Sequence, residues 1–258
     1  MKMNKFDEYL SSLKTAKSGA YLELDKSKEL SYMQLHKYRF VKILEGIPNS
    51  TNCLKILDIG ATPFTLFIKD VHPNFEVAAL DLTNLLAARF EAKKVKLRVC
   101  NLATQPIPFD DNYFDIIIFT EVFEHLLPPT DNVFREVSRV LRIGGKLIFG
   151  TPNFAALINR IRLLVGISPL APVDQQFKRG WVHGYGHVRE YTMKEVTEIL
   201  GNYNFIISKK KFISINPNVR SIKNTKMFLE QAYLLVCLLV PAFRQTIYVE
   251  CYKASRNN

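Results

Sequence analysis

Short apolar runs alternate with helical patterns along most of the chain. Five runs are typical of parallel strands covered on both faces, and they are Ile56–Ile59, Val77–Leu80, Leu97–Cys100, Ile116–Phe119 and Lys146–Phe149. Two later runs, Phe205–Phe212 and Thr246–Tyr252, supply the last two strands. The intervening helical patterns are Leu85–Lys93, Asn132–Leu141 and Met193–Leu200. This alternation predicts an α/β fold with a doubly wound, mostly parallel, Rossmann-like sheet of seven strands.

The N-terminal region carries a helical pattern of its own. Residues 1–48 are predicted to be helical, with an amphipathic stretch at Leu30–Leu44 that ends before Gly46. The chain therefore has a helical segment in front of the first strand.

Two apolar segments exceed what a minimal sheet domain needs. In Ala155–Val165 the apolar residues fall on one helical face, with Asn159, Arg160 and Arg162 opposite. Phe228–Phe243 is 16 residues long, too short to span a bilayer with a hydrocarbon core of about 30 Å. Each segment fits two interpretations, a lid helix packed on the domain or a helix lying in a membrane interface.

A glycine turn follows the first strand. Asp58 ends the apolar run and Gly60 comes two residues later, so the backbone can approach a ligand and present its N–H groups at a helix start. A dinucleotide-binding domain would have Gly-x-Gly-x-x-Gly at this point, and only one of those three glycines is present. Thr62 stands where a further glycine is expected, and a β-branched residue does not readily adopt positive φ. The loop is therefore predicted to be wider or differently shaped.

Further polar residues follow the other strands at similar positions. Asp81 ends the second strand, 21 residues after Gly60, and Asn101-Leu102 follows the third. Glu121 ends the fourth strand, at the edge where open α/β sheets bind ligands. With the segments Glu121–Leu126 and Glu136–Phe149, this ordered set resembles the class I S-adenosylmethionine-dependent methyltransferases of the small-molecule type 11/12 group, over roughly residues 40–205.

The resemblance implies a cofactor, S-adenosyl-L-methionine, and a set of residues that bind it. These residues are Asp58, Gly60, Ala61, Thr62, Asp81, Leu82, Asn101, Leu102 and Glu121. Asp58 would hold the amino group of the methionine part, and Asp81 would accept both ribose hydroxyls. Asn101 would bond the adenine, next to the backbone N–H and apolar wall of Leu102. The N-terminal helices would close over the cofactor, where Tyr32 or His36 either touches it or only packs.

The same resemblance divides the chain into two parts. Residues 1–48 would form a helical cap and residues 49–258 the methyltransferase domain. That domain would contain a helical insertion at about 154–190 and a basic, apolar C-terminal part at 205–258.

Catalytic groups are harder to assign, since methyl transfer depends mainly on alignment and exclusion of water. His187 is the best candidate for a general base, because an imidazole has a pKa near neutral. It lies in the segment Trp181–Thr192, which leads into a helix that Thr192 and Glu195 would cap. His125 is a second candidate. The structural alternatives are a histidine that bonds the loop backbone, for His187, and a helix-capping histidine, for His125.

The cysteines indicate no metal site. The four, Cys53, Cys100, Cys237 and Cys251, are widely spaced, without a Cys-x-x-Cys pair. Cys53 and Cys100 adjoin predicted strands, so we expect these two to be core or near-core reduced thiols in a cytoplasmic protein.

Positive charge is concentrated at the C-terminal end. Of the total net charge of +11, residues 205–258 carry +7, from nine basic and two acidic residues. Such asymmetry favours an anionic partner, either a membrane or a nucleic acid, although a solvated basic face would look the same. A nucleic acid is the weaker choice because no RNA-binding module is evident.

Together these features predict an S-adenosylmethionine-dependent methyltransferase. Its expected acceptor is an oxygen of a small or lipid-linked molecule, such as a glycan or quinone-like intermediate, and it would be cytoplasmic or attached peripherally to a membrane. An RNA methyltransferase and a non-catalytic, cofactor-binding scaffold are the alternatives.

Overall fold

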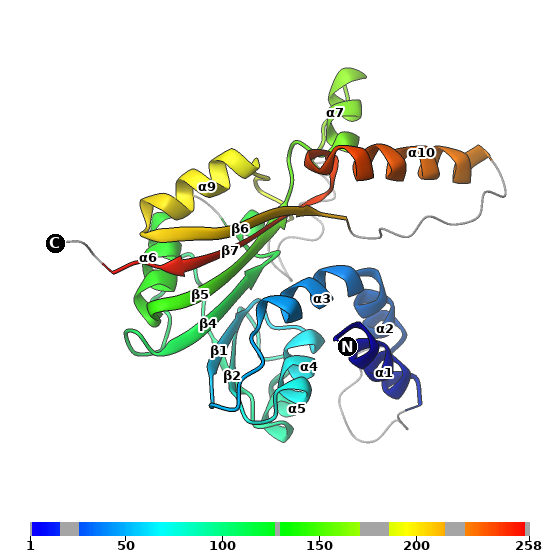
Figure 1. The fold of residues 1–258 in the computed structure, drawn as a ribbon. Coiled ribbons are helices and arrows are strands. Elements are labelled where there is room, and N and C mark those ends of the chain that lie inside the picture. Colours follow the sequence, from blue (N-terminus) through cyan, green and yellow to red (C-terminus); the bar gives the residue numbers. More distant parts are fainter. Residues whose placement is uncertain (1, 16–25, 127–129, 171–185, 215–224, 256–258) are drawn as a thin grey trace.

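A seven-stranded sheet forms the centre of the chain in the computed structural model, which describes residues 2–15, 26–126, 130–170, 186–214 and 225–255 (Figure 1). The strand order is β3-β2-β1-β4-β5-β7-β6. The strands are β1 (Lys55–Ile59), β2 (Glu76–Asp81), β3 (Lys96–Val99), β4 (Phe114–Thr120), β5 (Leu141–Pro152), β6 (Phe205–Ile213) and β7 (Thr246–Lys253). All neighbours pair in parallel except β7, which is antiparallel to both β5 and β6. The predicted fold class is therefore confirmed.

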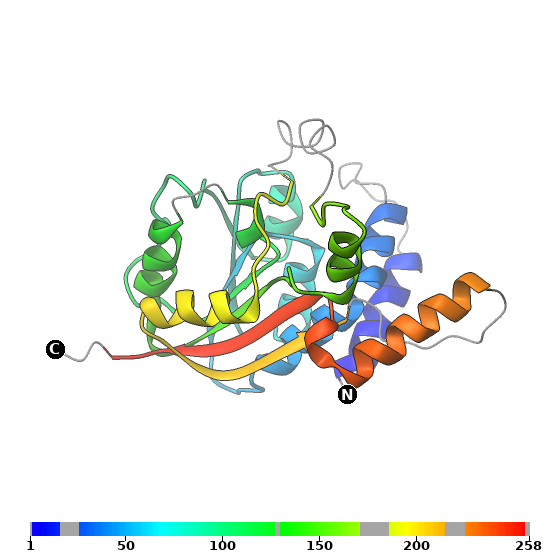
Figure 2. The same ribbon diagram turned by 90° about the horizontal axis from the view of Figure 1, so that it is seen from above.

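Helices cover both faces of this sheet (Figures 1 and 2). They are α1 (Lys2–Thr15), α2 (Lys26–Leu35), α3 (Lys37–Gly46), α4 (Pro63–Val71), α5 (Ala87–Ala92), α6 (Asp131–Val140), α7 (Leu157–Leu164), α9 (Met193–Asn202) and α10 (Thr225–Leu239), with single turns η1 (Phe123–His125) and η2 (Pro241–Phe243). Leu57 and Ile59 of β1 pack in one core with α6 and α9, whereas Ile56 packs in the other with α1 to α5. Alternation along β1 therefore directs Asp58 to the same side as α3 and α4.

The N-terminal helical region is folded onto α4. The predicted stretch Leu30–Leu44 is interrupted at His36, which separates α2 from α3. Phe40 of α3 stacks on Phe64 of α4 with 4.3 Å between ring centroids, and Phe6 of α1 packs edge-on against Phe67. This aromatic contact fixes α3 beside the loop that follows β1.

The apolar residues of α7 are exposed. Leu163, Leu164 and Val165 all lie on the surface, whereas Asn159 is buried. Asn159 thus lies opposite the exposed apolar residues, and of the two interpretations of this segment the exposure does not favour a lid helix packed by its apolar side. Asn159 is buried because its amide donates to the carbonyl of Phe154 (3.1 Å) and to Glu190 (3.1 Å).

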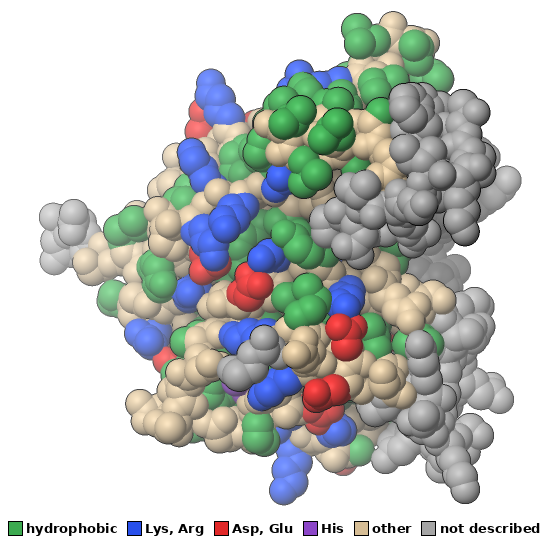
Figure 3. Space-filling model, turned by 45° about the vertical axis from the view of Figure 1, so that its right-hand side comes forward, with side chains coloured by type: hydrophobic (Ala, Val, Ile, Leu, Met, Phe, Trp, Pro, Cys, Tyr) green, Lys and Arg blue, Asp and Glu red, His purple; other side chains and the backbone are tan. Residues whose placement is uncertain are grey.

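The helix α10 extends from the end of the sheet as a separate arm (Figure 1). Its C-terminal end is attached by Arg244, which donates to the carbonyls of Cys237 (3.0 Å) and Phe212 (3.1 Å). Leu235, Leu238 and Leu239 remain exposed, and Figure 3 shows hydrophobic side chains gathered over this upper part of the molecule. Among the described residues, no helix is long and apolar enough to cross a membrane.

All four cysteines are free thiols. Cys100 is buried, as predicted, and so are Cys237 and Cys251, but Cys53 is exposed. The near-core prediction is therefore wrong for Cys53, which precedes β1 in a surface loop.

Candidate functional site

The loop after β1 depends on the absence of a side chain at Gly60. Its φ is +84°, which glycine adopts at no steric cost. A Cβ atom at this position would lie 2.4 Å from Cγ2 of Val122 in the loop after β4. The two loops therefore pass so closely that only glycine fits between them.

Thr62 shapes the rest of this loop as a helix cap. The φ of Thr62 is −136°, so no positive φ is needed. Its Oγ1 accepts from the N–H of Phe64, and the N–H of Thr62 donates to Oγ1 of Thr65 (both 3.2 Å). Pro63 follows at the first helical position, where its missing N–H costs nothing. The N–H groups of Thr62 and Phe64 are thus satisfied within the chain, and the expectation that they are free for a ligand is wrong. Ala61 is left as the half-buried residue between the glycine and the cap.

Asp58 lies beneath this loop as a buried carboxylate. Thr65 Oγ1 donates to its Oδ2 at 2.6 Å, which ties the end of β1 to the first turn of α4. Burial raises the pKa of Asp58 to about 7, against the lowering effects of the Thr65 hydrogen bond and of Arg39. A cationic ligand group at this point would favour the charged carboxylate.

An ion pair not predicted from the sequence lies next to Asp58. Arg39 of α3 pairs with Glu121 across 3.0 Å and donates to the hydroxyl of Tyr32 at 3.2 Å. His36 stacks on Tyr32, with 4.6 Å between ring centroids. Glu121 itself has a φ of +57°, which is uncommon for a residue with a side chain. The predicted cap residues therefore reach the site through Arg39, which the sequence alone does not distinguish from Lys37 and Lys42 of the same helix.

Two atoms of this ion pair are buried without a hydrogen-bond partner among the described residues. They are Nε of Arg39 and Oε1 of Glu121, and each unsatisfied group costs free energy. A guanidinium donor and a carboxylate acceptor together complement a ligand that ends in a carboxylate and an ammonium group. S-adenosylmethionine carries such an amino-acid end, so these residues fit the cofactor.

The remaining predicted cofactor residues follow β2 and β3 at the same edge of the sheet. Asp81 is half-buried, and its Oδ1 accepts from the N–H (2.9 Å) and hydroxyl (3.1 Å) of Thr83. These bonds orient the carboxylate with Oδ2 available for a ribose. Leu82 is exposed beside it.

Asn101 and Leu102 fit their predicted roles less completely. Oδ1 of Asn101 already accepts from the N–H of Ala103 at 3.1 Å, which leaves its amide N–H₂ group for an adenine. Leu102 is only 4 % exposed and packs in the core. Its side chain therefore does not line an open surface.

Replacing Asp81 by alanine is expected to weaken S-adenosylmethionine binding by about 2 kcal/mol, because the ribose hydroxyls lose a charged acceptor. Calorimetric titration of the cofactor measures the change. Asp70→Ala is the matched control, because Asp70 of α4 forms a surface ion pair with Lys93, which follows α5. Equal affinities for the Asp81 variant and the wild-type protein would remove Asp81 from the site.

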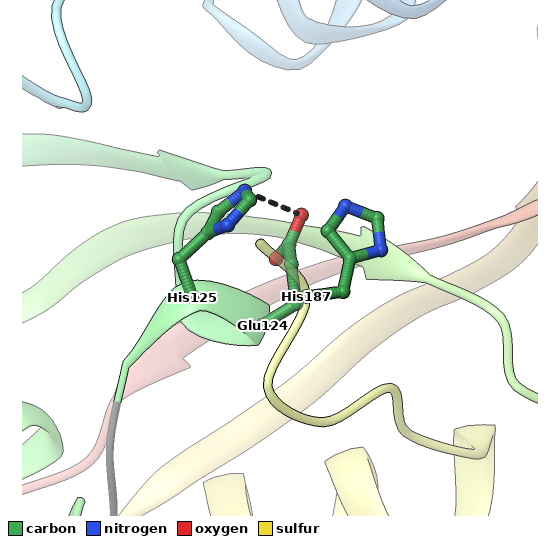
Figure 4. A group of neighbouring side chains, drawn as sticks. All are labelled: Glu124, His125 and His187. Carbon is green, nitrogen blue, oxygen red and sulfur yellow. Dashed lines mark ion pairs between the residues drawn. The ribbon is translucent and has the colours of Figure 1, made fainter. Parts of the chain in front are cut away.

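The turn η1 and the loop before α9 bring together three further groups (Figure 4). Ligand atoms of Glu124, His125 and His187 all lie within 4.8 Å of one another. The histidine rings meet edge to face with centroids 5.0 Å apart, and Oε1 of Glu124 lies 3.9 Å from Nε2 of His125. Burial and the neighbouring Glu121 raise the pKa of Glu124. The two predicted catalytic histidines are thus neighbours, and Glu124, which the sequence analysis did not single out, lies between them.

The imidazole ring of His187 is held by a carboxylate side chain. Its Nδ1 lies 2.9 Å from Oε1 of Glu190, and Asn159 holds the other oxygen of that carboxylate. The predicted capping box of Thr192 and Glu195 is present and ends this loop at α9. Trp181 and the rest of its segment up to residue 185 lie outside the described residues.

Comparison with known proteins identifies a recognised domain that contains part of this site. Residues 57–149 match the family described as "Methyltransferase domain". A sarcosine/dimethylglycine N-methyltransferase of Halorhodospira halochloris is 41% identical over 56 residues, which are 22% of this chain and 20% of that protein. The match therefore spans only a fifth of that relative's length.

Solved structures share the fold over most of the chain. In the complex between the Haloferax volcanii Trm112 methyltransferase activator and the putative methyltransferase, one chain superposes with a TM-score of 0.59 and 13% identity, covering 97% of this chain and 98% of that one. An S-adenosylmethionine-dependent methyltransferase from Archaeoglobus fulgidus gives a TM-score of 0.56 and 15% identity, with 84% and 94% covered. Residues 57–149 therefore form a methyltransferase domain, and the strand order and these solved structures show that the chain has the fold of class I S-adenosylmethionine-dependent methyltransferases.

Proposed function

We propose that this protein transfers the methyl group of S-adenosylmethionine to a hydroxyl oxygen of a small or lipid-linked acceptor. The observation that carries the proposal is the meeting of two groups of residues at one edge of the sheet. Asp58, Glu121 and Arg39 supply the charges that suit the amino-acid end of the cofactor. Glu124 and His125 in the turn after β4 meet His187 from the loop before α9, and these groups suit the removal of a hydroxyl proton.

The residues of this chain would contribute alignment and proton removal. S-adenosylmethionine supplies an electrophilic methyl group on sulfur. The ion pair of Arg39 with Glu121 and the carboxylate of Asp81 would hold the two ends of the cofactor, so that the transfer becomes an in-line displacement between aligned groups. His187 would take the hydroxyl proton, with its ring oriented by Glu190 at 2.9 Å.

A lipid-linked acceptor is supported by the exposed apolar surface of α7 and α10. Leu163, Leu164 and Leu239 are all more than half exposed, and large exposed apolar patches mark interaction sites. The basic residues of the C-terminal part add attraction to an anionic lipid surface. Such a surface would hold the protein where lipid-linked hydroxyls are found.

Labelled cofactor tests the proposal directly. The protein is incubated with S-adenosylmethionine labelled in the methyl group and with a membrane lipid extract, a water-soluble metabolite extract or total RNA in separate reactions. We expect base-stable label in the lipid or small-molecule fraction. Label in RNA alone would make the protein an RNA methyltransferase, and cofactor binding without label in any fraction would make it a non-catalytic scaffold.

Replacing His187 by alanine is expected to lower turnover roughly 100-fold with near-normal cofactor affinity, because the acceptor keeps its proton. Steady-state kinetics and cofactor titration separate the two quantities. His72→Ala is the matched control, since His72 follows α4, outside the candidate site. A rise in the acceptor KM with unchanged kcat would instead make His187 a positioning residue.

A further inference from the structure

The group of Glu124, His125 and His187 contains a buried acceptor that nothing in the described structure satisfies. Glu124 is fully buried, and its Oε1 has no hydrogen-bond partner among the described residues. In Figure 4 this oxygen lies between the two imidazole rings, and one ring nitrogen of His187 is on the edge of the ring nearer to the oxygen. Buried carboxylate oxygens without a partner are rare in native proteins, so this oxygen indicates a missing ligand.

We propose that Glu124, His125 and His187 bind a divalent metal ion, with zinc as the ion that the donors favour. One carboxylate and two imidazoles form an open set of three protein ligands, which leaves a position for water or substrate. Ligand bonds of about 2.0–2.2 Å place neighbouring ligand atoms about 3–4 Å apart. The observed separations, all within 4.8 Å, therefore require a contraction of up to about 1–2 Å.

The surrounding side chains orient these three donors as partners of metal ligands do. Glu190 occupies Nδ1 of His187, which leaves Nε2 for the metal, and Thr151 donates to Oε2 of Glu124 at 3.1 Å, which leaves Oε1. Carboxylate–histidine–metal arrangements of this kind fix the tautomer and the direction of the ring. Two of the three donors thus already have their second polar atom occupied.

The loop that carries His187 is tied to the turn that carries the other two donors. The N–H groups of Val188 and Arg189 donate to the carbonyl of Glu124 at 2.7 and 3.3 Å. His187 is therefore held beside η1 by the backbone, independently of the ring contacts. Donors from residues 124–125 and 187 form one preassembled site.

The role of the ion in catalysis rests on the proposed function. A hydroxyl group bound at the open position loses its proton to solvent more readily, because the ion stabilises the negative oxygen. That oxygen forms a bond to the methyl carbon as the carbon–sulfur bond breaks and its electron pair stays on sulfur. The products are a methyl ether, S-adenosylhomocysteine and one proton. In this arrangement His187 is a ligand, and the ion replaces it as the group that promotes deprotonation.

Metal titration of the full chain tests the site without any methyl transfer. Chelator-treated protein is titrated with Zn²⁺ by calorimetry, and Mn²⁺ serves as a second probe by electron paramagnetic resonance. We expect one equivalent of Zn²⁺ to bind, with affinity lowered by at least about 10- to 100-fold in Glu124→Gln and in His187→Asn. The first variant keeps the shape of the buried side chain, and the second lies in a half-exposed loop, so a failure of one to fold leaves the other.

Matched variants outside the cluster complete the experiment. Glu198→Gln on the surface of α9 and His72→Asn after α4 should bind Zn²⁺ like the wild-type protein. Absence of stoichiometric binding at millimolar zinc, or equal affinities in both ligand variants and the wild-type protein, would overturn the proposal. Cofactor titration with and without chelator separates the two ideas. Absence of cofactor binding in both conditions would defeat the proposed function alone, whereas equal methylation with and without chelator would remove the metal from catalysis.

Discussion

Gly60→Val is expected to abolish measurable binding of S-adenosylmethionine. Valine would have to adopt a φ of +84°, where L-residues with a branched Cβ are strongly disfavoured. Its Cβ would also lie 2.4 Å from Cγ2 of Val122, so the loops after β1 and β4 would separate. Because Asp58 lies at the end of β1 and Glu121 directly after β4, next to those two loops, the cofactor would lose two of its holding groups together. Calorimetric titration of the folded variant measures the loss.

Variants at two other glycines separate the possible causes of the lost cofactor binding. Gly166 has a φ of +72° with open space at its Cβ position, and Gly201 in α9 has open space without positive φ. Gly166→Val therefore reports the cost of backbone strain alone, and Gly201→Val reports the cost of a branched residue in a helix. Both should bind the cofactor like the wild-type protein. If Gly60→Val also does so, the loop after β1 does not hold the cofactor.

The sheet could be predicted from the sequence because its strands are covered on both faces. Runs such as Val77–Leu80 and Ile116–Phe119 are apolar at every position, and each lies within the corresponding strand, β2 or β4. The strand β5 is longer than its predicted core, beginning at Leu141 rather than Lys146. Its first residues include the pair Gly144-Gly145 and are largely exposed, so no apolar pattern marks them.

The cofactor side of the site was predictable only where its residues directly follow strands. Asp58, Asp81 and Glu121 have fixed positions relative to apolar runs, so spacing alone identifies them. Arg39 lies about 20 residues before the first motif and reaches Glu121 only because α3 packs on α4 through Phe40 and Phe64. Tertiary packing of this kind leaves no mark in local periodicity.

The cluster of Glu124, His125 and His187 could not be predicted from the sequence for the same reason. Glu124 and His125 are adjacent, but His187 follows more than 60 residues later, after β5, α7 and residues outside the described ranges. No metal site was expected, since the usual short spacings of metal ligands are absent. The cluster forms because the backbone of Val188 and Arg189 bonds to Glu124. Only the folded chain reveals this contact.

Wild-type protein is expected to sediment with vesicles of phosphatidylglycerol and phosphatidylcholine, and the double variant Leu235→Glu with Leu238→Glu is expected to lose this association. Leu235 is 57 % and Leu238 47 % exposed. Transfer of an apolar side chain of this size out of water contributes roughly 1.5–3 kcal/mol when complete. Each nearby basic residue adds about 1 kcal/mol on anionic lipid, so moderate salt should weaken the association.

The control is a second pair of equally exposed residues far from α10. Ile143 in β5 and Ile206 at the start of β6 are 55 % and 64 % exposed, so Ile143→Glu with Ile206→Glu adds the same two charges. This variant should sediment like the wild-type protein. Equal loss in both double variants would mean that added negative charge, rather than the apolar surface of α10, accounts for the result.

The exposure of Leu235 and Leu238 also determines how the thermal stability of the double variant is interpreted. A helix packed on the domain would hold Leu235 and Leu238 in its core, and two glutamates there would unfold the protein or cause aggregation. Both side chains lie on the surface instead, so the double variant should keep the thermal midpoint of the wild-type protein while it loses the vesicles. An unfolded variant would show that α10 packs by this face in solution, and failure of the wild-type protein to sediment at low salt would end the membrane proposal.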